Sequence, residues 1–338
     1  MARSPRKTRL RDIAAQANIS VPAVSMALAD HPRISLQTKR KVLQISEQLG
    51  YRSSQRLLDS SASGPSVKRV GFACIHGTLA DPLTATTMMH LAGLASRQEI
   101  AMETFCVEDI SDPAVLTRRL VKFAEGQDGV ILTGYVEQPA VDAVGKADVP
   151  LVVLGDPLRG TAVDHVSFDF QGAGRYATAH LLKQGYRRVA FVCELMAPGG
   201  ANSHWHDGYL LAHHDAGLTP DARLTLDLDD ANPERVYRQA PARVGEELIN
   251  LPEPATALVV SNPFIAEALI GALASGDSPL PMVTASLGTP RPVLQYLPQI
   301  ILSQEILAQY SFNRLLHICR HAHSRPLRTL VPYQTSGF

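Results

Sequence analysis

The chain has few cysteines and no long apolar run. Only four cysteines occur among 338 residues, and none of them stands in a C-x-x-C spacing. This pattern argues against a disulfide framework and favours buried free cysteines in a reducing compartment. The basic N-terminus is not followed by an apolar stretch, and no segment approaches the length of a membrane span. We therefore expect a cytoplasmic protein without a membrane partner.

Common catalytic motifs are missing as well. The sequence contains neither a G-x-S-x-G element nor a P-loop. One segment, Gly172-x-Gly174-x-x-Ala177, fits the dinucleotide-binding pattern G-x-G-x-x-A, and Glu194 follows at the end of the next predicted strand. An NAD-dependent oxidoreductase is therefore the alternative function. A lone glycine motif is weak and a dehydrogenase also needs a positioned acid or base, so we expect no enzyme and no cofactor.

A histidine cluster offers little support for a metal site. Only His206 with His213 or His214 approaches the spacing of one helix face, and no Cys or Glu joins them in a known zinc pattern. We expect histidines of the surface or of a pocket, and no bound metal.

A formal net charge of zero hides a strong asymmetry. Residues 1–56 contain eleven Lys and Arg against three Asp and Glu, a net charge of +8, so the rest of the chain carries −8. One basic end on an otherwise acidic protein indicates an anionic partner such as nucleic acid.

Three short amphipathic helices are predicted in this basic segment. The turn between the first two is only Asn18-Ile19-Ser20, which forces the helices to cross steeply, as in a helix-turn-helix. Thr8, Ser20 and Ser35 occupy the expected N-cap positions. The apolar faces of the three helices are Leu10, Ile13, Ala14 and Ala17, then Val21, Val24 and Leu28, then Val42, Ile45 and Leu49.

A linker separates this headpiece from a longer α/β region. Residues 60–66 read Ser-Ser-Ala-Ser-Gly-Pro-Ser, a composition typical of linkers. Beyond them, strand-like runs alternate with helical stretches, which predicts parallel sheets, and a break near Asp164–Gly172 divides the runs into two similar sets. We expect a headpiece with hinge at 1–58, a linker at 59–68 and an α/β domain at 69–338. The predicted strands are Val70–Ile75, Ala101–Val107, Val130–Thr133, Leu151–Leu154, Val189–Cys193, Leu258–Ser261 and Met282–Ala285.

Two parts of the chain resemble the LacI family of bacterial repressors. The resemblance covers nearly the whole chain. It implies an all-α helix-turn-helix headpiece and a periplasmic-binding-protein-like α/β sensor domain of two Rossmann-like subdomains. It also implies a homodimer. The stretches that carry it are Thr8–Leu28, Pro32–Ser35, Thr38–Val42 and Leu49–Arg52 in the headpiece, and Gln171–Leu182 with Gly185–Phe191 in the sensor domain.

The headpiece pattern also indicates which residues contact DNA. A recognition helix enters the major groove with its N-terminus first. Where relatives often have an arginine, this chain has Met26, which cannot make two hydrogen bonds to guanine. Two interpretations fit: readout through thymine methyls and groove shape, or a headpiece without sequence specificity. The predicted contacts are Val21, Pro22 and Met26 at base edges, and Arg9, Ser20, Ala23, Ser25 and Thr38 along the backbone.

The segment after Tyr51 departs from the family pattern. Relatives carry Pro-Asn before a hinge helix with a leucine wedge, and this chain has Ser53-Ser54 and, at the wedge position, Ser60. Leu57 and Leu58 either insert into the minor groove instead, where apolar wedges kink DNA, or pack against the sensor domain.

The resemblance places an effector in the cleft between the subdomains, at the carboxyl ends of strands. Asn262 and Gln304 match polar ligand-contact positions of sugar-binding relatives, and Asp156 lies close to another. His76 ends a further strand.

Two ligand-contact positions differ from those relatives. Trp205 replaces a cleft arginine, and Leu287-Gly288 stands where relatives have an aspartate. An exposed Trp205 would stack on a flat ring or an apolar sugar face; alternatively, it plugs a cleft that binds nothing. We expect common monosaccharides not to bind. The sequence thus predicts a DNA-binding transcriptional regulator, a repressor on a palindromic operator, controlled by a small molecule.

Overall fold

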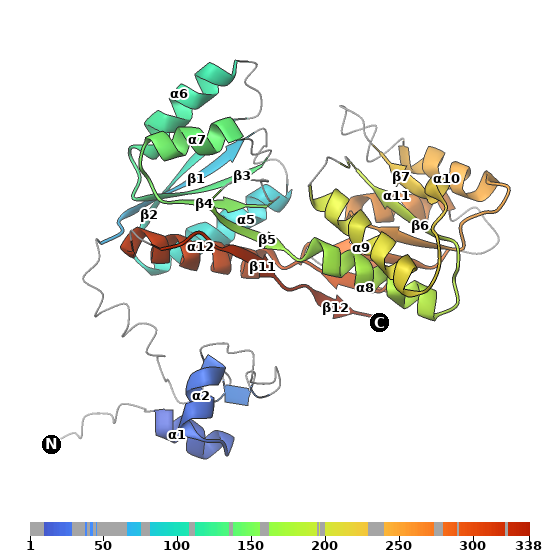
Figure 1. The fold of residues 1–338 in the computed structure, drawn as a ribbon, viewed down its shortest axis with the longest axis horizontal. Helices are drawn as coiled ribbons and strands as arrows, with labels where there is room; N and C mark the ends of the chain where they lie inside the picture. The colour runs from blue at the N-terminus through green and yellow to red at the C-terminus, as the bar shows by residue number, and fades with distance from the viewer. Residues whose placement is uncertain are drawn as a thin grey trace. The chain divides into compact units, whose positions relative to one another are not determined.

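The computed structural model divides the chain into two compact units, Met1–Pro65 and Ser66–Phe338 (Figure 1). The division falls inside the predicted linker 59–68, and the limits of the three predicted parts stay predictions. The structure describes residues 10–28, 38, 41–42, 45, 66–75, 82–107, 112–134, 138–155, 162–194, 196, 200–228, 240–273, 280–288, 291–321 and 324–338.

The first unit is built on two helices joined by a tight turn. Helix α1 (Leu10–Ala17) ends at Asn18, whose φ of 55° lies in the left-handed region that asparagine tolerates. Helix α2 (Val21–Leu28) begins after Ser20, whose hydroxyl accepts a hydrogen bond of 3.3 Å from the Ala23 amide. This is the predicted N-cap. Among the residues described in this unit, the buried apolar side chains are Ile13, Ala14, Ala17, Val24, Ala27, Val42 and Ile45.

The predicted third helix is described only in part. Thr38, Lys41, Val42 and Ile45 are helical, but the ends of this helix lie outside the described residues. Val42 and Ile45 are buried, as their spacing predicts.

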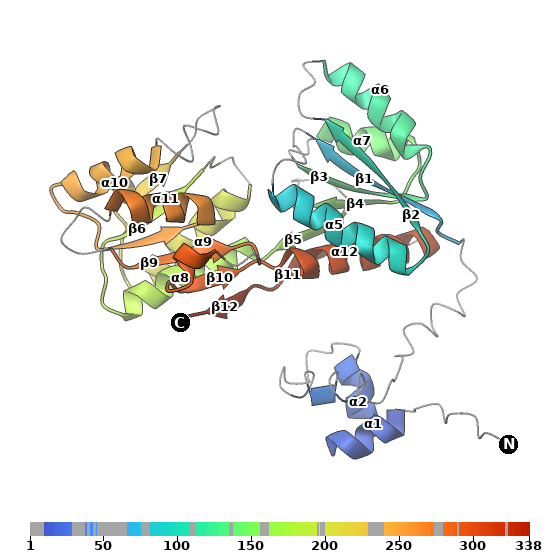
Figure 2. The same ribbon diagram turned by 180° about the vertical axis from the view of Figure 1, so that it is seen from behind.

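The second unit contains two six-stranded sheets. The first, sheet A, has the order β11-β5-β4-β3-β1-β2, and all its strands are parallel. Helices α5 and α12 cover one face, and α6 and α7 cover the other (Figure 2). The strands are β1 (Arg69–Ile75), β2 (Ala101–Val107), β3 (Gly129–Gly134), β4 (Leu151–Leu154), β5 (Asp164–Phe168) and β11 (Arg328–Val331). The helices are α5 (Pro82–Arg97), α6 (Pro113–Ala124), α7 (Gln138–Lys146) and α12 (Gln304–Arg320).

The second sheet, sheet B, has the order β12-β10-β9-β8-β6-β7, and only β12 runs antiparallel to its neighbour. Helices α8 and α9 pack on one face, and α10 and α11 pack on the other. The strands are β6 (Val189–Cys193), β7 (Thr225–Asp227), β8 (Ala257–Val260), β9 (Met282–Ser286), β10 (Gln299–Ile301) and β12 (Gln334–Ser336). The helices are α8 (Phe170–Lys183), α9 (Ala201–Asp215), α10 (Ala240–Asn250) and α11 (Pro263–Leu273), with short 3₁₀ turns at Ala222–Leu224 and Pro292–Leu294.

Successive residues of the central strands enter different cores. In β1, Phe72 and Cys74 belong to the core beneath α5 and α12, whereas Ala73 and Ile75 belong to the core beneath α6 and α7. A strand that is buried on both faces reads as a continuous apolar run. This is why the sequence located six of its seven predicted strands; the seventh, β2, lies at the sheet edge and is largely exposed.

The predicted break at Asp164–Gly172 is confirmed as the place where the chain passes from sheet A to sheet B, and the stretch itself forms strand β5 and the first turn of α8. Its polar residues suggest a loop, yet Asp164 and His165 are buried and both have hydrogen-bond partners. The Asp164 carboxylate accepts hydrogen bonds from Arg314 Nε at 2.5 Å and from the Leu327 amide at 2.9 Å. His165 Nε2 lies 2.9 Å from the Gly155 carbonyl oxygen, and burial lowers the pKa of His165 to about 4.

The chain crosses between the sheets three times, from β5 to α8, from β10 to α12 and from β11 to β12. The Asp169 amide donates a 3.0 Å hydrogen bond to the Val331 carbonyl and so joins the first and third crossings. Among the described helices, none combines the length and the apolar character that crossing a bilayer requires.

Candidate DNA-binding surface and effector site

The first turn of α2 presents an exposed apolar surface. Val21 is 40% exposed and Pro22 is also exposed, whereas Val24 is fully buried against α1. Val21 was predicted both on the apolar face of this helix and at base edges; of the described side chains on that face, Val24 is buried and Val21 is exposed. Its exposure leaves Val21 accessible to a partner.

The other predicted DNA contacts divide into three groups. Ser20 is exposed and Ala23 is half-buried, both at the start of α2, and Thr38 is half-buried in the third helix. Ser25 and Met26 lie on α2, but their side chains are outside the described residues, as are the whole of Arg9, Leu57 and Leu58. For all ten positions, DNA contact stays a prediction.

A polar cluster lies where strands β6 and β8 end. Four residues form it, and we refer to them as the β6–β8 cluster: Glu194, Asn202, Ser261 and Asn262. The Asn262 side-chain amide donates to Glu194 Oε1 at 2.5 Å, and the Asn202 amide donates to the Glu194 carbonyl oxygen. The Ser261 hydroxyl donates to Asn202 Oδ1 at 2.7 Å. The Asn262 oxygen also accepts the Phe264 amide at 2.8 Å, so it caps α11.

Glu194 is the electrostatically unusual member of the cluster. Its second carboxylate oxygen, Oε2, is buried and has no hydrogen-bond partner among the described residues. Burial raises the pKa of Glu194 to about 7, the negative charge of Asp227 adds to the rise, and the Asn262 hydrogen bond opposes it. Glu194 therefore changes charge near neutral pH.

This raised pKa predicts that the fold loses stability as pH rises. Below about pH 4.5, the usual pKa of the side chain, Glu194 is protonated in both states. Between that pH and about 7, the folded protein holds a proton that the unfolded chain releases, so the free energy of unfolding falls with pH. The loss is at most about 3 kcal/mol and is complete above pH 7. Denaturant unfolding from pH 5 to 8 measures it.

His165 requires a difference measurement, because its lowered pKa acts in the opposite direction. The unfolded histidine binds a proton below about pH 6.5 that the folded one does not bind until about pH 4, so its effect stabilises the fold as pH rises. Subtracting the curve of Glu194→Gln from that of the wild type isolates Glu194. Exposed Glu125→Gln serves as the control. Parallel curves for wild type and Glu194→Gln would contradict the assignment.

The other predicted effector contacts do not belong to the β6–β8 cluster. Gln304 is buried at the start of α12, where its oxygen accepts the Thr87 hydroxyl at 2.9 Å and its amide donates to the Leu302 carbonyl at 3.3 Å. Both polar groups of Gln304 thus have partners within the protein. His76 and Asp156 follow strands β1 and β4 but lie outside the described residues. Of the predicted set, the structure places only Asn262 in the β6–β8 cluster.

Two family models match the chain. The model for bacterial regulatory proteins of the lacI family matches residues 9–54. The model for periplasmic binding proteins and the sugar binding domain of the LacI family matches residues 78–237. The chain belongs to the LacI family.

Relatives within the LacI family are distant in sequence. The HTH-type transcriptional regulator MalR of Staphylococcus xylosus is 23% identical over 191 residues, so the match spans about half the length of that relative, 55%. The structure of a transcriptional regulator CelR–cellobiose complex aligns with a TM-score of 0.66 at 20% identity, over 97% of this chain and 98% of that one. The Lac repressor dimer bound to operator and the anti-inducer ONPF aligns with a TM-score of 0.66 at 18% identity, over 98% of both chains. These structures share the fold.

Trp205 does not have the exposure expected at this LacI-family position. The side chain is 1% exposed and belongs to the same buried core as Phe191 and Tyr209. Helices α8 and α9 pack closely: a Cβ added at Gly174 would lie 2.1 Å from the Trp205 carbonyl oxygen. This packing places the Trp205 side chain in the core, so the exposure that the stacking prediction assumes is not found, and ligand contact by Trp205 stays a prediction.

The same packing explains the glycines of the dinucleotide-like motif. Strand β5 belongs to sheet A and β6 belongs to sheet B, so Gly172 and Gly174 lie at a crossing between sheets and not in a βαβ unit. The N-terminus of α8, where a pyrophosphate would bind, is capped by Asp169, whose carboxylate accepts the Gly172 amide at 2.9 Å. The oxidoreductase alternative therefore has no support in this segment.

The histidines of α9 have structural partners. His213 is buried, with Nδ1 3.0 Å from the Tyr209 carbonyl oxygen, and His206 Nε2 lies 3.2 Å from the Thr225 hydroxyl. Burial lowers the pKa of both. Within the described part of the chain, no group of three or more His, Cys, Asp or Glu side chains is arranged to hold a metal ion.

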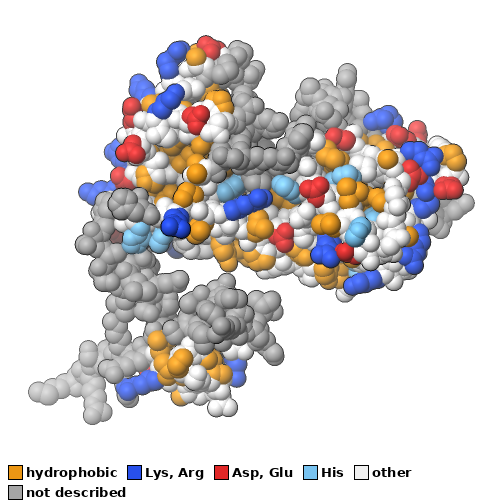
Figure 3. All heavy atoms as spheres, in the orientation of Figure 1, with side chains coloured by type: hydrophobic (Ala, Val, Ile, Leu, Met, Phe, Trp, Pro, Cys, Tyr) orange, Lys and Arg blue, Asp and Glu red, His pale blue; other side chains and the backbone are white. Residues whose placement is uncertain are grey.

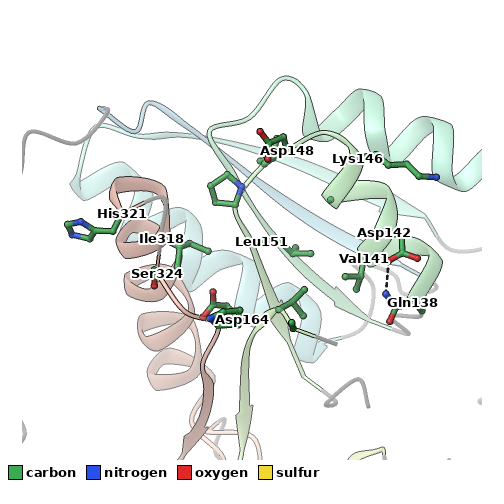
Figure 4. A pocket seen from close by; sticks show the side chains of 16 residues that line it. Gln138, Val141, Asp142, Lys146, Asp148, Leu151, Asp164, Ile318, His321 and Ser324 are labelled. Atoms are coloured by element: carbon green, nitrogen blue, oxygen red, sulfur yellow. Dashed lines mark hydrogen bonds between the residues drawn. The ribbon is translucent and has the colours of Figure 1, made fainter. Parts of the chain in front are cut away.

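An open cavity of about 940 Å³ lies at the opposite edge of sheet A from the strand ends where an effector is expected (Figure 4). It is bordered by the starts of β4 and β5, by α7 along its length and by the end of α12. Its walls include Val141, Leu151 and Ile318, with Lys146 and Asp148 at the border. None of the predicted effector contacts lines it.

Glu194, Asn202 and Ser261 were not among the predicted effector contacts. Glu194 was noticed only as the acid of a dinucleotide motif. The available signal was its place directly after an apolar strand, since the carboxyl ends of parallel strands in one sheet meet at the same edge. Asn202 lies on a helix and is brought to that edge by tertiary packing.

Proposed function

We propose that this protein is a transcriptional repressor that binds a palindromic operator as a homodimer and responds to a small molecule. The observation that carries the proposal is the geometry of the headpiece: a capped second helix after a tight turn, with exposed Val21 and Pro22 at its N-terminus. That end is the part of a recognition helix that reaches base edges.

The charge distribution supports the same function. Residues 1–56 carry a net charge of +8, which suits the phosphate backbone of DNA. On the face of the second unit drawn in Figure 3, basic and acidic side chains are interspersed. The electrostatic part of DNA affinity therefore resides in the first unit.

The effector acts in this proposal by binding one conformation of the second unit better than another. A ligand shifts DNA affinity only through this difference, and the coupling is reciprocal: DNA changes the affinity for the effector by the same factor. No catalytic step and no cofactor belong to the mechanism.

The proposal is tested by selecting fragments of genomic DNA with the purified full-length protein and sequencing them. We expect one recurrent motif with two-fold symmetry, because a two-fold dimer presents two recognition helices to half-sites about 10 base pairs or a multiple apart. Recovery of fragments without a shared motif would instead identify a headpiece that has lost sequence specificity. A nicotinamide or flavin absorbance in the purified protein would favour the oxidoreductase.

Met26→Arg should change the preferred base near the dyad-distal end of each half-site. An arginine makes two hydrogen bonds to guanine that methionine lacks, which favours guanine by about 1–3 kcal/mol. Selection of sites from a random pool by the wild type and the variant measures the change. Arg97→Met, an exposed change on α5 in the second unit, provides the control. Identical motifs from wild type and Met26→Arg would show that position 26 does not face the bases.

A further inference from the structure

The β6–β8 cluster contains an acceptor that the protein itself leaves unused. Asn262 holds one oxygen of the Glu194 carboxylate, while Oε2 is buried without a partner among the described residues. Buried polar groups in folded proteins are nearly always paired, so an unpaired carboxylate oxygen at a strand end points to a missing partner. That partner must donate a hydrogen bond.

The neighbours of Glu194 fix its position. The Asn262 amide from the β8–α11 junction and the Asn202 amide from α9 both donate to this residue, and Ser261 holds Asn202 in turn. On the remaining neighbouring strand, β7, Asp227 accepts the Met196 amide at 2.9 Å and is the charged group that acts on Glu194. The carboxylate is therefore held in place before any ligand arrives, as a specific site requires.

The strand ends of the second unit are acidic in sequence. Neither of the two residues that follow each strand is Lys or Arg. After five strands, one of these two positions is acidic. At sheet B, where the cluster lies, Asp227 at the end of β7 acts electrostatically on Glu194 after β6, and two acidic groups of one sign disfavour an anionic ligand between them and the solvent. Representative acidic residues, one after each of β2, β4, β5, β6 and β7, are Glu108, Asp156, Asp169, Glu194 and Asp229.

We propose that Glu194 determines the specificity of the effector site: its free oxygen accepts a hydrogen bond from a hydroxyl or ammonium group of the effector, and the site excludes anionic effectors. This inference rests on the proposed function, since it assumes that the effector binds at the strand ends of sheet B. It narrows the effector to a neutral or cationic small molecule and excludes phosphorylated or carboxylated ones.

The titration of Glu194 gives the inference a second readout. A donor that binds the ionised carboxylate stabilises the charged form and lowers the pKa of Glu194, which burial holds at about 7. Below neutral pH, effector binding therefore releases a proton. The Cys193 thiol beside it does not contribute, because burial raises its pKa.

The test uses the full-length protein and probes that differ mainly in charge. One set is cellobiose, the glucosamine disaccharide of the same linkage, and cellobiouronic acid; the other is adenosine, 5′-amino-5′-deoxyadenosine and adenosine monophosphate. Thermal stabilisation and titration calorimetry measure binding. We expect binding within at least one set by the neutral or the ammonium-bearing probe and none by its anionic counterpart. Tighter binding of an anionic probe, or binding by none of the six, would overturn the proposal.

Variants then assign the effect to the carboxylate. Glu194→Gln keeps the shape of the side chain but removes its charge. Glu194→Asp keeps the charge but shortens the side chain, so that the carboxylate lies farther from the ligand. Each variant should weaken the affinity for the bound probe tenfold or more. Glu125 is exposed and directly follows helix α6, so Glu125→Gln should leave the affinity for the probe unchanged. Calorimetry at pH 6.5 in two buffers of different ionisation enthalpy should show proton release by the wild type and none by Glu194→Gln. Unchanged affinity in both Glu194 variants would refute the role.

DNA binding separates this inference from the proposed function. Gel shifts with the selected operator should succeed for the wild type and for the control Glu125→Gln alike, because the first unit carries the DNA contacts. If the operator is bound but the probes behave contrary to expectation, only the inference about Glu194 fails. If no operator is bound, the proposed function fails.

Discussion

Trp205→Ala is expected to lower the free energy of unfolding by about 3–5 kcal/mol, the cost typical of removing a large buried aromatic side chain. Trp205 is 1% exposed and lies in the core of the second unit, where α9 meets α8. The truncation leaves a cavity that the closely packed backbones of these helices cannot collapse to fill. Denaturant unfolding followed by circular dichroism measures the loss.

Two controls make the Trp205 experiment specific. Tyr296 is 85% exposed, so Tyr296→Ala should change stability by no more than about 0.5 kcal/mol. Trp205 is the only tryptophan, so the fluorescence of the wild type reports its surroundings: we expect blue-shifted emission that resists quenching by acrylamide. Red-shifted, readily quenched emission together with a small loss of stability would contradict the burial of Trp205 and support an exposed Trp205 in the effector site.

The sequence predicted those elements whose side chains lie mostly in an apolar environment. Strands such as β1 and β8 are buried on both faces, so their residues must be apolar and the runs stand out. Strand β5 was missed because the polarity of Asp164 and His165 suggests a loop. Their partners are Arg314, which lies far away in sequence, and Gly155, which directly follows strand β4. The order of polar and apolar residues along the chain does not show which side chains pair in the folded protein.

The candidate site was predictable to a lesser extent. Asn262 was found by resemblance, but its bond to Glu194 depends on the joint placement of β6 and β8. Trp205 shows the opposite case: its position in the family pattern suggested an exposed side chain, whereas Gly174 lets the backbones approach and the indole enters the core. Family position gives the location of a residue along an element, and packing decides where its side chain lies.

Removal of the first unit is expected to abolish operator binding. A fragment of residues 69–338 keeps the second unit, which is compact by itself, but loses the segment with net charge +8 and the exposed start of α2. Without phosphate contacts and base readout, affinity should fall by about a thousandfold or more, the range that separates specific from non-specific binding. Gel shifts or fluorescence anisotropy with the selected operator measure it, and a circular dichroism melt checks that the fragment is folded.

Salt dependence distinguishes loss of phosphate contacts from loss of folding. Affinity of the full chain should fall tenfold or more between low and physiological ionic strength, because each phosphate contact releases counterions. Arg11 is exposed on α1, the helix that crosses the backbone in a helix-turn-helix, so Arg11→Gln should weaken binding and reduce the logarithmic salt slope by about 1. Lys183→Gln, an exposed change at the end of α8, should alter neither. Operator binding by the folded fragment, with the same salt slope as the full chain, would place the DNA-binding surface in the second unit.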